Sequence, residues 1–210
     1  MSSKVISKAE GRFRRLGEVD PSARAAALAR ASGKDAALVE IILGESRELV
    51  RAARGILICE TRHGFVCANA GVDGSNVPGD GVVLLLPVDP DRSARELRAA
   101  LDQSIGVAPA VVIADSFGRP WRLGQTDIAI GAAGLSVLDD LRGRSDRHGH
   151  ELHATVIAVA DAVAGAADLA RTKDSGEPVV IVSGLGRHVT RLPGPGAAAL
   201  RRPRADDLFR

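Results

Sequence analysis

The sequence predicts an α+β fold in which helices pack on a mixed β-sheet, and three observations support this prediction. Hydrophobic residues make up 45% of the 210 positions, which is enough to bury a substantial core. Short apolar runs typical of strands alternate with longer segments of helical periodicity. The alternation is irregular and shows no internal repeat, which disfavours a barrel or a doubly wound sheet. We therefore expect one domain spanning residues 1–210.

Helix signals dominate the first quarter of the chain. A stretch over 21–31 is rich in alanine and ends before a Ser-Gly pair, which predicts a helix. A second apolar stripe at helical spacing runs over 35–53, where Asp35 can cap its start and Gly44 interrupts it. One or two further helices are therefore expected in that segment.

Apolar runs bounded by Gly, Asn, Pro and Asp predict the strands. The expected strands are 56–59, 65–70, 82–86, 110–114, 127–133, 151–159 and 178–182. Two longer periodic segments predict helices, 90–105 with Asp91 or Ser93 as its cap, and 160–173. Strand and helix thus alternate through the second half of the chain.

A short apolar run near the front, residues 4–6, resembles the end of a buried strand. Only three residues precede this run. We therefore expect a sequence that starts late, with the beginning of the strand upstream of it.

Composition and charge argue against several classes of function. The 28 Lys and Arg residues against 26 Asp and Glu leave a net charge of +2 without a basic strip, and aromatic residues are only 2%, so nucleic-acid binding is not expected. No stretch is long and apolar enough to span a membrane, and no secretory signal begins the chain, so a cytoplasmic location is expected. Cys59 and Cys67 can face each other across a hairpin, where two buried free thiols are favoured over a disulfide.

Polar side chains follow two of the predicted strands, where an α/β scaffold usually presents its chemistry. Asp73 and Asn76 lie among glycines after one strand, and Asp115 and Ser116 directly follow another. Two carboxylates and a hydroxyl are hard oxygen ligands that suit Mg²⁺ or Mn²⁺. The alternative is that both aspartates only cap turns.

Lysines and serines at the front form a second candidate site. Ser3, Lys4, Ser7 and Lys8 make a short basic and hydroxylic patch that suits a triphosphate, although solvated lysines are the simpler alternative. The chain has neither of the two common glycine-rich phosphate loops, so a nucleotide would be bound in another way. A zinc site at the histidines of 148–153 and a serine nucleophile at Ser183 are both disfavoured, because their flanking patterns do not match.

Several longer segments, taken in order, point to one family. They are Ser-Lys-Val-Ile-Ser-Lys-Ala-Glu-Gly-Arg at 3–12, Glu-Thr-Arg-His-Gly at 60–64, and the segments 70–77, 85–91 and 115–122. Together they resemble the coenzyme F420-0:L-glutamate ligase family. Their order and spacing hold from residue 3 to residue 131, and the closing 207–210 also resembles bacterial members.

The resemblance implies an activity and a set of site residues. The implied reaction is GTP-dependent amide-bond formation between L-glutamate and the coenzyme F420 precursor, F420-0, through an acyl phosphate. Implied metal ligands for Mn²⁺ or Mg²⁺, with K⁺ as a further candidate cation, are Asp73, Asp115 and Ser116, the two aspartates being the catalytic residues. Implied guanine-nucleotide contacts are Ser3, Lys4, Lys8 and Asn76. The family resemblance also implies a homodimer with the F420 gamma-glutamyl ligase-like fold, and a loop over 171–178 that closes on the phosphates.

Some features of the chain depart from the family pattern. Members carry an opening strand and an acidic glycine loop before the Ser3-Lys4 motif, a glycine before the position of Lys173, and commonly an arginine in place of Ser183. These departures favour, as the alternative to an active ligase, a catalytically silent paralogue that binds a deazaflavin or a partner subunit. From their charge and position, Arg119 and Arg122 are expected to hold an anionic substrate.

Overall fold

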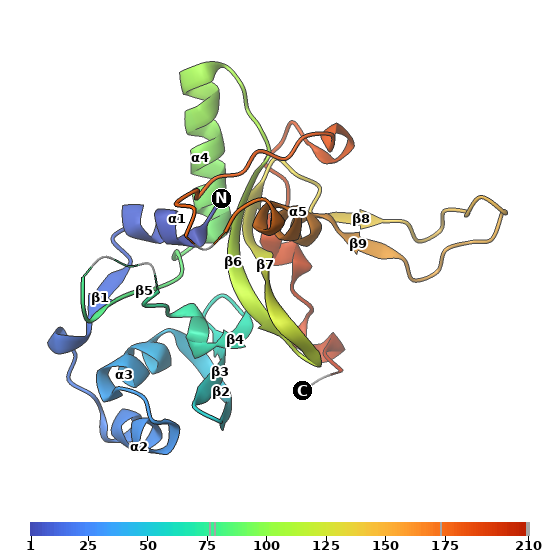
Figure 1. Ribbon diagram of the computed structural model, residues 1–210. Coiled ribbons are helices and arrows are strands. Elements are labelled where there is room, and N and C mark those ends of the chain that lie inside the picture. Colours follow the sequence, from blue (N-terminus) through green and yellow to red (C-terminus); the bar gives the residue numbers. More distant parts are fainter. Residues whose placement is uncertain (76, 78, 173, 209–210) are drawn as a thin grey trace. The chain divides into compact units, whose positions relative to one another are not determined.

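The computed structural model describes residues 1–75, 77, 79–172 and 174–208 (Figure 1). The chain divides into two compact units. Unit 1 contains Met1–Ser2, Asp89–Ser116 and Thr126–Arg210, and unit 2 contains Ser3–Val88 and Phe117–Gln125. The prediction of one domain over 1–210 stays a prediction.

Unit 2 combines helices with two small antiparallel sheets. Its helices are α1 (Ser3–Ala9), α2 (Ala23–Ser32) and α3 (Ala36–Gly44), with short 3-10 turns at Leu16–Glu18 and Asn69–Gly71. Its strands are β1 (Phe13–Arg15), β2 (Ser46–Ala53), β3 (Ile56–Thr61), β4 (Val66–Ala68) and β5 (Val82–Leu84). One sheet has the order β2-β3-β4 and the other pairs β1 with β5.

The core of unit 2 forms where α2 and α3 pack beside β3. Ala25 of α2, Ile42 of α3, and Leu57 and Cys59 of β3 are all fully buried in one hydrophobic cluster. Side-chain caps begin the helices, since Ser22 accepts from the Ala25 amide and Asp35 from the Leu38 amide. The buried apolar residues and the side-chain caps thus both account for where α2 and α3 form.

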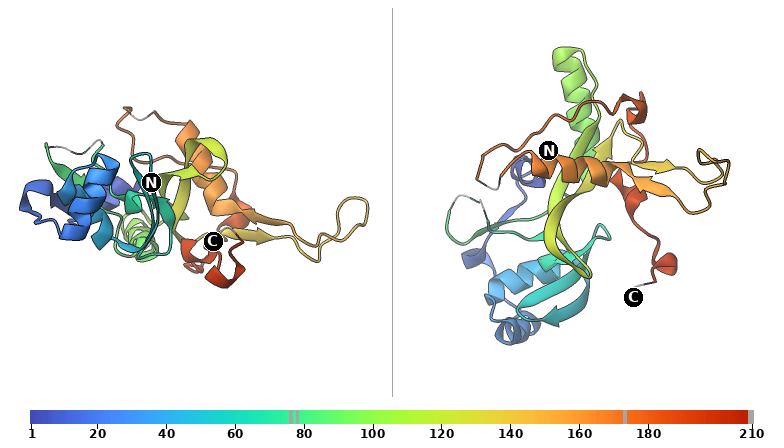
Figure 2. Two further views of the ribbon diagram at one scale, coloured as in Figure 1. Left: turned by 90° about the horizontal axis from the view of Figure 1, so that it is seen from below. Right: turned by 45° about the vertical axis from the view of Figure 1, so that its right-hand side comes forward.

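Unit 1 is built around the strands β6 and β7. Its helices are α4 (Pro90–Ile105) and α5 (Val159–Leu169), with 3-10 turns at Gly186–His188, Ala197–Leu200 and Arg204–Asp206. Its strands are β6 (Val111–Arg119), β7 (Arg122–Ala133), β8 (Leu138–Asp140) and β9 (Val156–Ala158), paired as β6-β7 and β8-β9. The far ends of β6 and β7, with the turn between them, belong to unit 2. Figure 2 shows the connection between β8 and β9 as a long arm of unit 1.

The core of unit 1 lies between β7 and α5. Ala132 of β7 and Val159 and Ala160 of α5 are buried in one cluster with Ala197. The Asp161 carboxylate on α5 accepts a hydrogen bond from the Ala129 amide of β7 at 2.9 Å. This bond and the apolar cluster hold the helix on the strand.

The α+β fold class is confirmed, and the sheet pairing among the described residues consists of small antiparallel ladders. The cysteine prediction is also confirmed, because Cys59 and Cys67 are direct partners across β3 and β4 and both are buried free thiols. Burial raises the pKa of the Cys59 thiol, partly offset by hydrogen bonds from Ser46 and Ala70. The Cys59 thiol therefore remains protonated and acts as a small apolar side chain.

Two predictions near the front were wrong. The run at 4–6 lies in helix α1, not in a strand, because α1 buries Ser3 and Ser7 while Val5 stays exposed. The helical stripe over 35–53 ends at Gly44, and the rest forms β2. Strand β2 arises from the turn that follows it, where Arg54 and Gly55 both have positive φ and close a hairpin with β3.

Other element boundaries differ from the predictions. The expected strand at 178–182 is not formed in this described segment: the Pro178 carbonyl accepts one backbone bond from Ser2, but Ile181 is 92% exposed, so its side chain is not packed. The expected strand over 151–159 shortens to β9, and β6 and β7 extend well beyond their predicted runs. Asp89, not Asp91 or Ser93, caps α4 by accepting from the Arg92 amide.

Candidate functional site

The Asp73 loop of unit 2 is held against strand β5. The backbone of Asp73 exchanges two hydrogen bonds with Leu84, at 3.0 and 2.9 Å. Beyond this bridge the Asp73 carboxylate accepts from the amide and the hydroxyl of Ser75. Two donors of one loop residue, Ser75, therefore orient the carboxylate before any ligand is considered.

Lys4 of helix α1 lies directly on this carboxylate. Its ammonium is 2.7 Å from Asp73 Oδ2 and donates to the carbonyl and hydroxyl oxygens of Ser75. Burial alone would raise the pKa of Asp73, but the Lys4 ammonium and the Ser75 donors outweigh it and lower the pKa below its ordinary value of 3.8. The two residues predicted as nucleotide contact and metal ligand thus lie in one ion pair.

A pocket of about 390 Å³ lies beside this ion pair, between α1 and the sheet of β1 and β5. Its lining residues are Lys4, Val5, Lys8, Phe13, Arg15, Val77, Gly79, Val82 and Leu84. The β1–β5 register pairs Phe13 with Leu84 and Arg15 with Val82, so both pairs present side chains to the same face. The pocket therefore combines three cationic side chains with an apolar wall.

The other predicted nucleotide contacts are placed differently. Lys8 lines the pocket and is exposed, as predicted for a phosphate contact. Ser3 is 2% exposed and does not line the pocket, so its predicted contact finds no support in the pocket geometry. Asn76 lies outside the described residues.

The second predicted metal segment lies on β6 in unit 1. Ser116 donates its hydroxyl proton to Asp127 Oδ1 on β7, at 2.6 Å. Asp127 is 2% exposed, and its other oxygen accepts from the Arg171 guanidinium. Sequence reasoning missed both Asp127 and Arg171 in this role, because their pairing brings together residues 44 positions apart.

Loop 171–178 starts at this buried pair. Arg171 also donates to the Pro178 carbonyl oxygen at 3.5 Å, which links the two ends of the loop. Within the loop, Thr172 donates to Asp174 at 2.6 Å. Lys173 lies outside the described residues, and closure of the loop over phosphates stays a prediction.

The donor set determines which metal these residues fit. No three His, Cys, Asp or Glu side chains gather as a metal site anywhere in the part of the chain that the structure describes. Asp73 belongs to unit 2, and Asp115 and Ser116 to unit 1, so their convergence on shared cations stays a prediction. The oxygen donors fit Mg²⁺ or Mn²⁺, which take one or two carboxylates and complete their shell with phosphate oxygens and water. Asp115 and Ser116 are successive residues of β6, and their common binding of a cation stays a prediction.

The expected anion-binding arginines lie at the tip of the β6–β7 hairpin. Arg119 donates to the Leu123 carbonyl at 3.2 Å, and Arg122 is exposed. Trp121 between them has a positive φ and is 81% exposed. Both arginines are therefore accessible, and their contact with substrate stays a prediction.

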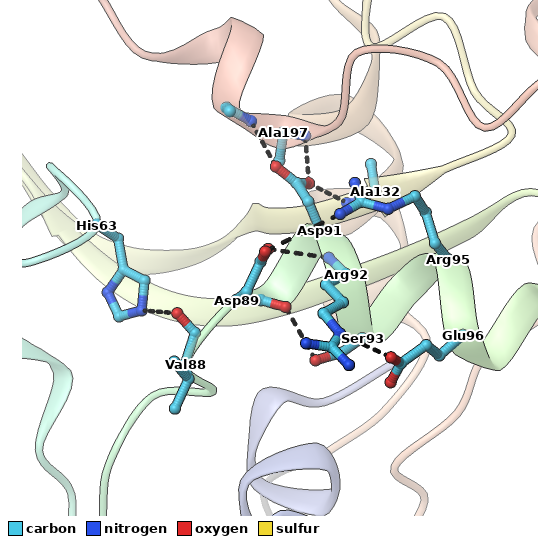
Figure 3. A network of polar contacts seen from close by, with 11 residues as sticks. His63, Val88, Asp89, Asp91, Arg92, Ser93, Arg95, Glu96, Ala132 and Ala197 are labelled. Carbon is cyan, nitrogen blue, oxygen red and sulfur yellow. Dashed lines mark hydrogen bonds and ion pairs between the residues drawn. The ribbon is translucent and has the colours of Figure 1, made fainter.

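A polar cluster around Asp91 in unit 1 has a structural role. The Asp91 carboxylate accepts from the backbone amides of Ala132, Ala197 and Ala198, as Figure 3 shows for the first two. Gly196 leaves room for this carboxylate, because a Cβ there would lie 2.4 Å from Asp91 Cγ. The Asp91 carboxylate therefore binds backbone amides of unit 1 and has a structural role.

His63, from the Glu-Thr-Arg-His-Gly motif, is also engaged in packing. Its Nε2 lies 2.8 Å from the Pro87 carbonyl oxygen and 3.1 Å from that of Val88, the latter drawn in Figure 3. Its ring packs against Phe65 with centroids 5.8 Å apart. The motif thus fixes the segment that leads out of β5.

A family model and several known enzymes match this chain over most of its length. The family model described as F420-0:Gamma-glutamyl ligase matches residues 1–184. The coenzyme F420:L-glutamate ligase of Methanopyrus kandleri is 48% identical over 98% of this chain and 82% of its own length. The enzymes of the same name from Methanothermobacter thermautotrophicus and Methanocaldococcus jannaschii are 46% and 41% identical over 98% of this chain and 81% of their own lengths. No helix among the described residues is long and apolar enough to cross a membrane.

Proposed function

We propose that this chain, which belongs to the F420-0:gamma-glutamyl ligase family, joins the amine of L-glutamate to the coenzyme F420 precursor through an amide bond, with GTP as co-substrate. The observation that carries the GTP proposal is the pocket that Lys4, Lys8 and Arg15 line beside the Asp73 carboxylate. Lysine ammoniums bind phosphate as point charges, and the apolar wall can hold a ring. The pocket thus has both features that a nucleotide requires.

The reaction we propose has two steps. The terminal carboxylate of the precursor attacks the γ-phosphorus of GTP, which releases GDP and leaves an acyl phosphate. The glutamate amine then attacks the acyl carbon, loses a proton and expels inorganic phosphate. Neither step requires a covalent bond to the protein, so catalysis is a matter of alignment and charge stabilisation.

Each residue has a distinct part in this scheme. Lys8 and Arg15 would neutralise phosphate oxygens in the pocket. Mn²⁺ or Mg²⁺ bound by Asp73, Asp115 and Ser116 would supply the remaining positive charge on the phosphates. Lys4 cannot pair fully with both Asp73 and a phosphate, so we expect its ammonium to turn from the carboxylate toward the nucleotide when ligand binds.

A mass-spectrometric assay tests this proposal. Protein mixed with GTP, Mn²⁺, L-glutamate and F420-0 is expected to yield a product heavier by one glutamyl unit, with GDP and phosphate released in equal amounts. Asp73→Asn and Lys8→Met are each expected to reduce turnover by at least about tenfold, as for loss of a charge-stabilising group. Lys34→Met, which changes a lysine of unit 2 that does not line the pocket, is the matched control and should keep wild-type turnover. Glutamylation with ATP but not with GTP would contradict the nucleotide assignment alone.

The silent paralogue is not favoured by the described site. The charged or hydroxyl groups that the ligase chemistry needs are all retained, at Lys4, Lys8, Asp73, Asp115 and Ser116.

A homodimer remains part of the proposal. Light scattering coupled to size-exclusion chromatography measures the mass directly, and a value near twice 21.8 kDa is expected.

A further inference from the structure

One buried carboxylate of unit 1 has no part in the reaction described so far. Asp127 is 2% exposed on β7, in contact with Ser116 on one side and Arg171 on the other. A buried carboxylate loses much of its hydration, and only well-aligned donors offset that cost. Asp127 has two such donors, and one of them is a predicted metal ligand.

The direction of the Ser116 hydrogen bond has a chemical consequence. A hydroxyl has one proton, and that of Ser116 points to Asp127 Oδ1 at 2.6 Å. Toward every other group the Ser116 oxygen can therefore only accept, which is the state that a metal ligand must have. The Arg171 guanidinium has only donors and pairs with the other Asp127 oxygen, so Asp127 Oδ1 serves as the acceptor for Ser116.

We propose that Asp127, held by Arg171, is a positioning residue that fixes the Ser116 hydroxyl with its oxygen available to a divalent cation. The proposal rests on the proposed function, since it assumes that Ser116 binds metal. It also gives Arg171 a second effect, because the same guanidinium links the ends of loop 171–178 through the Pro178 carbonyl. Partners behind a metal ligand commonly set its orientation, and their loss lowers metal affinity about 10- to 100-fold.

Asp127→Asn is the informative substitution because it preserves size. Arg171 has only donors to offer, so it will take the amide oxygen and turn the amide nitrogen toward Ser116. The nitrogen would then donate to the Ser116 oxygen and occupy the electron pair that a cation needs. Manganese affinity is therefore expected to fall by about tenfold or more, to the level of Ser116→Ala.

The measurement is the relaxation rate of water protons during titration with Mn²⁺ alone and with Mn²⁺–GTP, because the rate rises when the ion binds protein. Asp127→Asn combined with Ser116→Ala should bind no more weakly than Ser116→Ala alone, as expected of residues that act through one another. Asp161→Asn is the matched control: it neutralises another partly buried carboxylate of unit 1 whose partner is a backbone amide, and should keep wild-type manganese affinity.

The outcomes separate the inference from the function on which it rests. If wild-type protein binds Mn²⁺ in neither titration, both the metal assignment and this inference are wrong, whereas glutamylation can still be assayed. Unchanged affinity in Asp127→Asn, or an equal loss in Asp161→Asn, overturns only the inference. If Asp127→Asn fails to fold, Arg171→Met decides in protein shown to be folded by circular dichroism, because it removes the group that holds Asp127: lower manganese affinity supports the inference, and wild-type affinity refutes it.

Discussion

Each unit of the molecule contains an aspartate paired with a cationic side chain, and the two pairs differ in burial. In unit 2 the Lys4 and Asp73 side chains are 27% and 46% exposed. In unit 1 the Arg171 and Asp127 side chains are 14% and 2% exposed. An exposed pair contributes little to stability and can exchange partners, whereas a buried pair is costly to break. We therefore expect the Lys4–Asp73 pair to exchange partners more readily than the Arg171–Asp127 pair.

Removing the cation from the buried pair should have the largest effect on stability. Arg171→Met leaves the Asp127 carboxylate buried without one of the two side-chain donors described above. The free energy of unfolding should fall by about 3 kcal/mol or more, as for other buried pairs that lose one partner. Denaturation in urea measures the change. A loss below that of Lys4→Met would contradict the assignment of the buried pair as structural.

The next largest loss of stability is expected for Asp91, whose contacts with three backbone amides can be compared with the helix cap that Asp89 provides. Asp91→Ala removes the acceptor for three backbone amides of unit 1, with an expected loss of about 2 kcal/mol. Asp89→Ala removes the cap of α4 and an exposed ion pair with Arg95, for which about 1 kcal/mol in total is expected. Thermal unfolding of the two variants under one condition tests the order. Equal losses of stability in the two variants would show that the three Asp91 hydrogen bonds contribute no more than the single cap at Asp89.

In the exposed pair, Lys4→Met should change ligand binding much more than stability. The expected stability loss at neutral pH is at most about 1 kcal/mol, because both side chains reach solvent. The pKa of Asp73 is lowered in the folded state, so its stabilising contribution is present above the ordinary value of 3.8 and is lost as pH falls through the lowered pKa. The gap in unfolding temperature between wild type and Lys4→Met should therefore close as pH decreases below about 4. A gap that widens on acidification would contradict the ion pair.

How much the sequence could predict depends on whether an element is determined by neighbouring residues or by distant ones. Local signals predicted α2, α3, the α4 range and the facing cysteines, because caps, periodicity and hairpin spacing act within a few residues. Strand β2 was missed because its pattern is compatible with a helix until the Arg54-Gly55 turn and the pairing with β3 are known. The local sequence pattern therefore predicts an element correctly only where no alternative element is stabilised by pairing with a distant segment.

The same limit applies to the candidate site. Lys4, Lys8 and Asp73 were predicted from family motifs, and the structure places all three in or beside one pocket of unit 2. Asp127 and Arg171 were not assigned a role, because no local pattern connects a strand residue to an arginine 44 positions later. A motif preserves the residues that contact ligand, but the groups that orient them are identified only by tertiary contacts.

The smallest predicted effect concerns Asp161, and it tests whether every buried carboxylate of unit 1 stabilises the fold. Burial raises the pKa of Asp161, although the bond from the Ala129 amide opposes the shift. A raised pKa means that its contribution is fully present below the unfolded value and is lost as pH rises through the folded pKa. Asp161→Asn retains an acceptor for the amide but carries no charge, so relative to wild type it should gain stability as pH rises from 3 to 7. Unfolding temperatures across this range measure the difference, with Asp127→Asn expected to show the opposite sign at pH 7 because it weakens a charged pair. Destabilisation of both variants at pH 7 would mean that unit 1 requires the charge at each position, and not only at the one that Arg171 balances.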